Sequence, residues 1–528
     1  MFARKRKMLF QKNFGKEPSR RYFVGDLELI KSYFEFCREQ NPDSYYVDDI
    51  TWNDLDLDRI FKRINMKLTT SGEQTLYYQL RTPVLNPEEY QKRYELLNLV
   101  ESDPDLRLKL QMTLSRLGCN RHVDIFTHLK QKQKTHKWLL IHILQSLLFA
   151  ASLVSLVLIG INGILAILGV MVINGIVHEL RVRKCSAEFD WVNYAVSLIC
   201  TVKKIRKLHD PSLDTYFKDT YKHLERLNFA GWTGGVTKSY DKGLADMLNT
   251  VSLLDLIVFE YLKGKLSVCQ TEVLSMHEAI GNLDAAISIA SYRASLSHFT
   301  EPEIDFQTKK PYSYIENMCH PLLEDPVPNS LHTEKPILIT GSNASGKSTY
   351  LKTAALNTLL AQTICTVPAD SYQASAFRIY SSMALNDDLL SGESYYIVEI
   401  KSIKRILDKT EGLVPIFCTI DEVLRGTNTV ERIAASSEIL KHLAGQGVLC
   451  LAATHDGELC DLLSSQYEMY HFEEKFENQD MIFDYQIRPG KAVSRNAINL
   501  LQLLGFEADI IQGAHERANR YINTGIWS

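Results

Sequence analysis

The chain has 528 residues, 45% of them hydrophobic, and a formal net charge of -4. This length and composition indicate a globular protein of about two to four domains with real cores. Because the charge is nearly balanced, the overall charge gives no argument for a nucleic-acid partner. The ten cysteines form no C-x-x-C pair and no Cys/His cluster at zinc spacing, so they are interpreted as reduced core residues of a cytosolic protein.

A basic arm at residues 1–45 opens the chain. Its first 21 positions hold eight Lys and Arg residues against one acid, Glu17. No apolar run follows these charges, so the pattern does not predict a secretory signal. Such an arm is usually a solvated tail, and contact with anionic lipid or DNA phosphate is the alternative.

Residues 46–130 have helical periodicity, with apolar side chains such as Leu57, Ile60 and Ile64 three or four positions apart. A proline-bounded turn that begins near Pro83 separates the expected helices. We predict that this segment forms the first part of an all-α domain.

Residues 138–177 contain no charged residue, and a break at residues 160–163 (GING) divides them. Each half is close to the roughly 20 residues that cross a bilayer core. Basic residues flank both ends, and two crossings would leave both soluble parts in the cytoplasm. We therefore expect a transmembrane helical hairpin within residues 131–184, in contact with membrane lipid, which places the protein at the cytoplasmic membrane. A buried hairpin inside a large soluble core is the alternative.

The sequence pattern changes after the hairpin. Residues 185–305 return to helical periodicity and are predicted as the second part of the all-α domain. Within residues 306–528, short apolar runs then alternate with helical ones, which is typical of a doubly wound α/β domain. Residues 337–340, 414–420 and 448–453 are predicted as its buried parallel strands.

A phosphate-binding motif follows the first of these strands. Residues 341–348 (GSNASGKS) fit G-x-x-x-x-G-K-[ST] in full, and a helical pattern begins directly after them. Backbone N–H groups of such a loop surround phosphates, Lys347 reaches the terminal phosphates, and Ser348 offers a hydroxyl to magnesium. We therefore expect ATP and Mg²⁺ as cofactors. The predicted nucleotide-binding residues are Gly341, Ser342, Asn343, Ala344, Ser345, Gly346, Lys347, Ser348 and Thr349.

Two acids, Asp421 and Glu422, end the next predicted strand, which places them at the carboxyl edge of the sheet beside the phosphates. We expect Asp421 to hold magnesium, directly or through water, and Glu422 to orient or deprotonate the attacking water. His455, after the following strand, can bond the γ-phosphate or that water. The expected catalytic residues are thus Glu422, His455 and Lys347. Helix capping by the acids and a structural role for the histidine are the alternatives.

Together these motifs resemble the ATPase domain of the MutS mismatch-repair family, a relative of ABC-type ATPases. The segments that carry the resemblance are residues 317–324 (NMCHPLLE), 340–353 (TGSNASGKSTYLKT), 387–400 (DDLLSGESYYIVEI), 421–429 (DEVLRGTNT), 453–455 (ATH) and 487–504 (IRPGKAVSRNAINLLQLL). Residues 57–87 are similar to the start of the family's core and lever domain. The resemblance implies a P-loop NTPase of α/β class, C-terminal to an all-α core and lever domain that the membrane hairpin interrupts.

The resemblance also implies a homodimer with ATP sites shared between subunits. Ser391, Gly392 and Ser394 would then contact the γ-phosphate bound by the partner's P-loop, and C-terminal helices at 497–521 would help the chain to dimerise. The aromatic residue that stacks on adenine in the family is replaced, with Val327 as the candidate in its place.

The chain also departs from the family pattern. Few residues precede the core, and the F-x-E tripeptide of a mismatch reader occurs only at 299–301 and 472–474, both in the wrong region. We expect an ATP-dependent DNA-binding protein of MutS type that hydrolyses ATP in a membrane-tethered homodimer to open and close a clamp. A membrane scaffold or signalling ATPase without nucleic acid is the first alternative. An ABC-transporter-like ATPase is the second, and it is disfavoured because two crossings make a poor translocation path.

Overall fold

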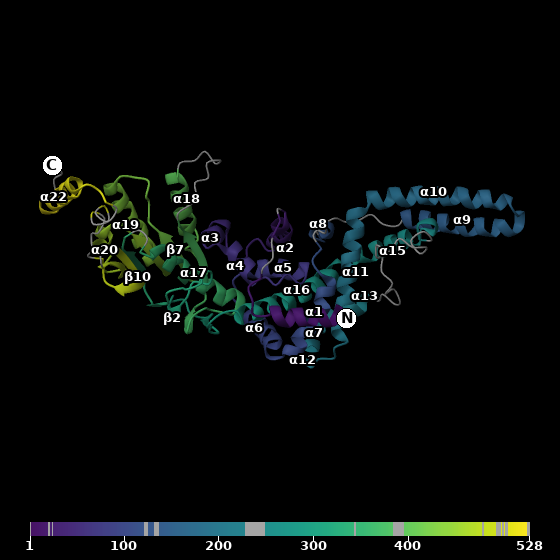
Figure 1. The fold of residues 1–528 in the computed structure, drawn as a ribbon, viewed down its shortest axis with the longest axis horizontal. Helices are drawn as coiled ribbons and strands as arrows, with labels where there is room; N and C mark the ends of the chain where they lie inside the picture. The colour runs from purple at the N-terminus through teal and green to yellow at the C-terminus, as the bar shows by residue number, and fades with distance from the viewer. Residues whose placement is uncertain are drawn as a thin grey trace. The chain divides into compact units, whose positions relative to one another are not determined.

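Figure 1 shows the computed structural model of the protein. The structure describes residues 2–18, 22–23, 25–120, 125–130, 137–227, 249–342, 345–383, 395–477, 480–492, 498, 501 and 505–524. Contacts divide the chain into two compact units. The first, called the helical unit here, comprises residues 1–44, 64–78 and 95–294. The second, called the sheet unit, comprises residues 45–63, 79–94 and 295–528.

The regular elements described in the helical unit are all helices. They are α1 (Phe2–Asn13), α2 (Asp26–Gln40), α7 (Pro104–Leu117), α8 (Ile125–Lys130), α9 (Lys137–Ile159), α10 (Asn162–Lys184), α11 (Ser186–Arg206), α12 (Pro211–Tyr216), α13 (Lys218–Leu227), α15 (Leu254–Val268) and α16 (Gln270–Arg293). Three further helices have residues in both units, namely α4 (Leu57–Ile64), α5 (Thr70–Arg81) and α6 (Pro87–Ser102). The helical character predicted for the N-terminal region is confirmed.

The buried helix α16 lies at the centre of the helical unit, and small residues allow α5 to approach it closely. A Cβ atom on Gly281 of α16 would lie 2.1 Å from the Thr75 hydroxyl oxygen of α5. A Cβ atom on Gly72 of α5 would meet the carboxylate of Asp284 at 2.0 Å. That carboxylate accepts hydrogen bonds from the backbone N–H and the hydroxyl of Thr69, at 2.9 and 2.6 Å. The glycines therefore leave room at the helix crossing for a buried acid whose Oδ2 is hydrogen-bonded to Thr69.

The helices α9 and α10 form a hairpin, as the sequence predicts. The turn falls at Gly160, whose positive φ of 62° suits a residue without a Cβ atom. The stretches Lys137–Leu158 and Asn162–Lys184 are long and apolar enough to cross a membrane by length and composition. Only 11% of the apolar part of each helix is buried. The hairpin therefore presents a large apolar surface that the described residues of the chain leave exposed.

The sheet unit holds two sheets. The larger has six strands in the order β10-β9-β4-β8-β7-β6, with β10 antiparallel to β9 and the other neighbours parallel. Its strands are β4 (Ile337–Thr340), β6 (Arg378–Ser382), β7 (Ile416–Asp421), β8 (Val448–Thr454), β9 (Glu468–Glu477) and β10 (Asp480–Pro489). The three parallel strands predicted from the sequence are confirmed as β4, β7 and β8.

A smaller sheet, which the sequence did not predict, has the order β1-β5-β2-β3. Its strands are β1 (Glu303–Asp305), β2 (Ser313–Met318), β3 (Asn329–Thr333) and β5 (Ser371–Ser375). The helices of the sheet unit are α3 (Asp49–Asp54), α17 (Lys347–Ile364), α18 (Tyr395–Leu407), α19 (Thr429–Gly445), α20 (Gly457–Leu462) and α22 (Ala508–Thr524).

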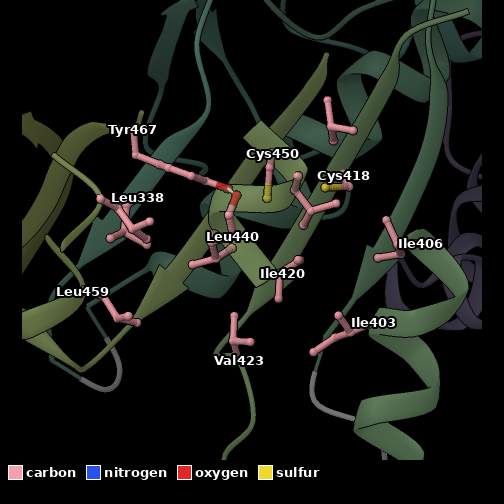
Figure 2. Packing of buried hydrophobic residues seen from close by; sticks show 14 of the residues in the cluster. Leu338, Ile403, Ile406, Cys418, Ile420, Val423, Leu440, Cys450, Leu459 and Tyr467 are labelled. Carbon is pink, nitrogen blue, oxygen red and sulfur yellow. Dashed lines mark hydrogen bonds between the residues drawn. The ribbon is translucent and has the colours of Figure 1, made fainter. Parts of the chain in front are cut away.

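Alternate residues of the central strands fill one hydrophobic cluster beneath α18, α19 and α20 (Figure 2). Leu338, Ile420 and Cys450 come from three neighbouring strands and are fully buried there. The Tyr467 hydroxyl reaches the same cluster and donates to the Leu440 carbonyl oxygen at 2.9 Å. The intervening strand residues are buried as well, and α17 contacts the same strands. This two-sided burial explains why the strands are continuous apolar runs.

The segment that contains α3 covers β6, the edge strand of the larger sheet. Tyr45 accepts from the Ile379 backbone N–H at 2.7 Å and donates to its carbonyl oxygen at 2.6 Å. The Asp54 carboxylate accepts from the Ser381 hydroxyl at 2.6 Å and from the Met383 N–H at 3.0 Å. These bonds draw residues 45–63 into the sheet unit, whereas the sequence grouped them with residues 46–130 as one helical domain.

Candidate functional site

The loop between β4 and α17 has the conformation that its glycines make possible. Gly341 has a φ of 146° and Gly346 a φ of 108°, and both values are unfavourable for other residues. A Cβ atom on Gly346 would lie 3.2 Å from the Tyr485 ring, and one on Gly341 would lie 3.0 Å from the Phe472 carbonyl oxygen. The two glycines therefore allow the loop to turn tightly into the start of α17, where unpaired backbone N–H groups favour an anion.

Lys347, the first residue of α17, is 5% exposed and folds back over the loop. Its Nζ donates to the carbonyl oxygens of Gly341 and Ser342, at 2.8 and 2.7 Å. Burial lowers the pKa of Lys347, while the nearby carboxylates of Asp421 and Glu422 act in the opposite direction. The ammonium group thus lies at the loop, on a flexible stem that can carry it to a bound phosphate.

The next residue, Ser348, lies beside the end of β7. Its hydroxyl donates to the Asp421 Oδ2 at 2.5 Å, and the Asp421 side chain is almost fully buried. A hydroxyl oxygen and a carboxylate oxygen side by side are hard oxygen donors of the kind that magnesium prefers. This pair therefore fits a magnesium ion held against a phosphate on the loop.

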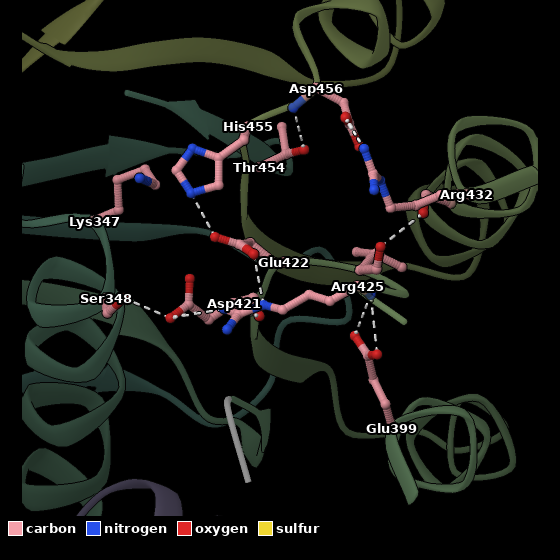
Figure 3. Close-up of polar contacts among 12 residues, drawn as sticks. Lys347, Ser348, Glu399, Asp421, Glu422, Arg425, Arg432, Thr454, His455 and Asp456 are labelled. Carbon is pink, nitrogen blue, oxygen red and sulfur yellow. Dashed lines mark hydrogen bonds and ion pairs between the residues drawn. The ribbon is translucent and has the colours of Figure 1, made fainter. Parts of the chain in front are cut away.

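Glu422 lies between two basic side chains (Figure 3). His455 Nε2 is 2.5 Å from its Oε1, and Arg425 Nε is 2.6 Å from its Oε2. Burial acts to raise the pKa of the Glu422 carboxyl, but His455, Arg425 and Lys347 outweigh burial, so this pKa lies below its ordinary value. The residue has a positive φ of 60°, and its N–H donates to the Ala453 carbonyl oxygen at 3.0 Å. The carboxylate is therefore ionised and firmly placed at the carboxyl edge of the sheet.

The segments around Glu422 are held by further polar contacts, which Figure 3 includes. The Arg425 backbone N–H donates to both Glu399 carboxylate oxygens, at 3.2 and 3.0 Å. Beyond His455, the Asp456 carboxylate accepts two bonds from the Arg432 guanidinium, at 2.8 and 2.6 Å. A bidentate pair of this kind fixes orientation as well as distance. The sequence did not predict these contacts, because each joins a residue of a helix, Glu399 or Arg432, to a connecting segment that follows a strand.

A pocket of about 620 Å³ opens over the loop. Val327, 39% exposed, forms part of its wall, and so does Tyr485, which the sequence did not predict as a site residue. The residues that line the pocket are Met318, His320, Leu323, Asp325, Pro326, Val327, Asn329, Ser342, Ser345, Gly346, Lys347, Ser348, Thr349, Tyr350, Thr353, Asp421, Glu422, Arg425, Phe472 and Tyr485. Burial lowers the pKa of His320 to about 4, so this side chain is neutral near pH 7.

Tyr485 reaches the pocket because β10 is irregular at this point. The pairing of β10 with β9 shifts register between Phe483 and Ile487, and Tyr485 has a positive φ of 53°. Asn329 holds both sides of the irregularity: its Nδ2 donates to the Tyr485 carbonyl oxygen at 2.9 Å, and its Oδ1 accepts from the Ile487 N–H at 2.9 Å. Strand irregularities of this kind redirect a side chain. The sequence offers no signal for this irregularity, because apolar and polar residues alternate regularly from Phe483 to Ile487.

The structure thus brings together Lys347, Ser348, Asp421, Glu422 and His455, which come from three separate segments of the sequence. Ser342, Ser345, Thr349 and Val327 also line the pocket. Five predicted site residues lie outside the described residues, namely Asn343, Ala344, Ser391, Gly392 and Ser394.

A phosphate loop, an oxygen pair for a metal and an acid placed at the sheet edge define a P-loop ATPase. Residues 337–521 match the family model of MutS domain V. MutS domain V is an ATPase domain, and residues 337–521 are similar to it.

The chain is similar to curated DNA mismatch repair proteins. It is 29% identical to MutS of Natronomonas pharaonis over 269 residues, which are 49% of this chain and 31% of the relative. It is 30% identical to MutS of Bacillus subtilis over 282 residues, 51% of this chain and 32% of the relative. It is 30% identical to Msh3 of Dictyostelium discoideum over 284 residues, 48% of this chain and 20% of the relative. The matches thus span a third or less of each of these relatives.

Proposed function

We propose that the protein is a membrane-tethered MutS-type ATPase that binds DNA and uses ATP to close and reopen a homodimeric clamp. The observation that carries the proposal is that the Ser348–Asp421 pair and the Glu422–His455 pair lie at the same phosphate loop. This arrangement supplies a place for phosphate, for magnesium and for an attacking water on one side of a sheet.

In the proposed reaction, Lys347 leaves the loop carbonyl oxygens and pairs with the terminal phosphates, while N–H groups at the start of α17 hold their oxygens. Ser348 and Asp421 would hold the magnesium ion, which supplies positive charge to the β- and γ-phosphate oxygens. Glu422 orients the attacking water and accepts its proton. His455 keeps the Glu422 carboxylate in position and can bond the γ-phosphate. Arg425 must release Glu422 before water reaches its Oε2, since it now lies 2.6 Å from that oxygen.

The proposed clamp needs two copies of the chain. Ser391, Gly392 and Ser394 would complete the site of the partner, as the resemblance to the family implies. The C-terminal helix α22 would contribute to dimerisation, since Ile510 and Tyr521 expose apolar surface along it. ATP then stabilises the closed dimer because each nucleotide contacts both subunits.

Tyr485 is proposed to stack on the base of the nucleotide in the pocket that it lines together with Val327. We expect Tyr485→Ala to raise the KM for ATP about tenfold, because stacking on an aromatic ring contributes about 1–3 kcal/mol per base. Tyr485→Phe keeps the ring and should keep the KM within about twofold. Steady-state ATP hydrolysis measures both variants. An unchanged KM in the alanine variant would show that Tyr485 does not contact the base.

The hairpin of α9 and α10 is proposed to anchor the protein in the cytoplasmic membrane, with the soluble parts before and after the hairpin in the cytoplasm. We expect the full-length protein to stay with membranes after high-salt and carbonate washes. The double substitution Leu148→Asp and Leu168→Asp should release it, because an acid at the bilayer centre costs about 3 kcal/mol. Leu462→Asp, at an exposed apolar residue of α20, is the matched control and should leave retention unchanged. Release of the parent protein by salt alone would reject the anchor.

DNA binding is proposed from the relatedness of the ATPase domain to mismatch repair proteins. Fluorescence anisotropy with duplex and branched DNA should give an affinity that falls at least about tenfold between 50 and 200 mM salt, because phosphate contacts release counterions. Absence of salt-dependent binding, with ATP hydrolysis intact, would favour a membrane scaffold or signalling ATPase instead.

A further inference from the structure

The helix α15 packs beside α9 in the helical unit (Figure 1). Its outer face is apolar. Leu254, Tyr261 and Val268 are 51%, 49% and 84% exposed along this face, and Ile257 and Val258 are half-buried between them. These positions follow helical spacing, so they form one stripe. The stripe adjoins the exposed apolar surface of the hairpin, but it lies on α15, which is not part of the hairpin.

Polar contacts fasten the start of α15 to the C-terminal half of α10. Three residues of α10, spaced four and three positions apart on one face, each find a partner in residues 251–260. The pairs are Asn174 Nδ2 with the Val251 carbonyl oxygen at 2.7 Å, His178 Nε2 with Asp255 Oδ2 at 2.7 Å, and Arg181 with Glu260. Each of these three side chains of α10 therefore has a polar partner in the segment that contains α15.

The contacts also indicate how deep the residues of the hairpin would lie in a bilayer. The Arg181 guanidinium lies 4.3 Å from the centre of the Trp138 ring, so the two residues mark one level across α9 and α10. The helical rise from Asn162 to Arg181 is about 28 Å, close to the roughly 30 Å of a bilayer core. Tryptophan and arginine are typical of the membrane boundary. When the turn of the hairpin reaches the far boundary, Trp138 and Arg181 thus lie at the near one.

On this scale, Asn174 and His178 lie about 18 and 24 Å from the turn, within the near half of the hydrocarbon. Their partners Val251 and Asp255 must then lie at the same depth. A bilayer tolerates such polar groups only when they are paired, and these groups are paired. Asp255 also accepts from the Leu256 N–H at 2.8 Å, which satisfies one N–H group at the start of α15.

We propose that residues 251–261 lie in the near leaflet beside the hairpin, so that the membrane anchor has three helical elements rather than two. Leu254, Ile257 and Val258 contact acyl chains, Tyr261 lies at the boundary, and Lys265 lies in the headgroup layer. The polar contacts with α10 exclude lipid between the two segments. This inference rests on the membrane anchor of the proposed function.

Photo-crosslinking in vesicles of phosphatidylethanolamine and phosphatidylglycerol tests the inference. Benzoylphenylalanine replaces Leu254 in one full-length variant, Val157 near the hairpin turn in a second, and Lys265 in a third. Mass spectrometry then measures the lipid adduct formed on irradiation. We expect adducts at positions 254 and 157 to exceed that at 265 by about tenfold, because acyl chains surround only the first two. Retained ATP hydrolysis shows that each variant is folded.

The outcomes separate the two proposals. An adduct at 157 without one at 254 would overturn the three-element anchor and leave the hairpin in place. A protein–protein adduct at 254 would also overturn it, since a second copy would then cover the stripe. Absence of lipid adducts at both positions would instead reject the membrane anchor itself.

Discussion

Glu422→Gln is expected to slow ATP hydrolysis by about 10²–10⁴-fold while leaving ATP binding nearly intact. The amide keeps the size of the side chain and can still contact His455 and Arg425, but it cannot accept the proton of the attacking water. ATP should therefore remain bound, and the closed dimer should accumulate. Single-turnover hydrolysis of labelled ATP measures the first effect, and light scattering coupled to gel filtration measures the second.

Glu438→Gln is the matched control, because Glu438 is an exposed acid of α19 away from the pocket. The turnover of this variant should equal that of the parent protein.

The pH profile of ATP turnover gives a second check on Glu422. Because the Glu422 pKa is lowered, the carboxylate is ionised above its ordinary pKa of about 4.3, and turnover that depends on it is lost only as the pH falls through the lowered value. Rapid hydrolysis by Glu422→Gln would remove the water-activating role.

Lys347→Ala is expected to reduce ATP turnover by at least about 10²-fold and to weaken ATP binding, because the variant loses the buried cation that pairs with the terminal phosphates. Lys347→Arg should recover little of this loss, since the planar guanidinium cannot replace a compact ammonium group in a narrow loop. Binding of a fluorescent ATP analogue separates the loss of affinity from the loss of turnover.

Lys352→Ala provides the comparison on the same helix. Lys352 lies outside the pocket, where its Nζ is 3.1 Å from the Asp56 carboxylate, and its removal should leave turnover unchanged. Equal losses in the two alanine variants would indicate a general effect on α17. Unchanged turnover in Lys347→Ala would show that the phosphate site has been assigned wrongly.

Much of the sheet unit could be predicted from the sequence because its signals are local. Continuous apolar runs predicted β4, β7 and β8, and their parallel pairing followed from the helical patterns between them. The glycine and lysine spacing at residues 341–348 predicted a phosphate loop between a strand and a helix. The acids after β7 were expected at the sheet edge for the same reason, since carboxyl ends of parallel strands meet there.

The features that escaped prediction depend on contacts between distant segments or on irregular turns of the backbone. Tyr485 enters the pocket only because β10 departs from regular pairing and Asn329 holds that departure in place. The ion pair of Glu422 with Arg425 requires the turn after β7, where Leu424 also has a positive φ of 61°. The short strands β1, β2, β3 and β5 have too few residues for their alternation to stand out.

The covering of β6 affects how copies of the protein behave when they are crowded. An uncovered edge strand offers free N–H and C=O groups to another chain, which is a common route to aggregation. Tyr45 and Thr51 bond such groups on β6, and Asp54 bonds the N–H of Met383 directly after it. A tether would confine many copies to one plane and raise their collision rate. The covered edge then directs their association away from growth of a continuous sheet between molecules.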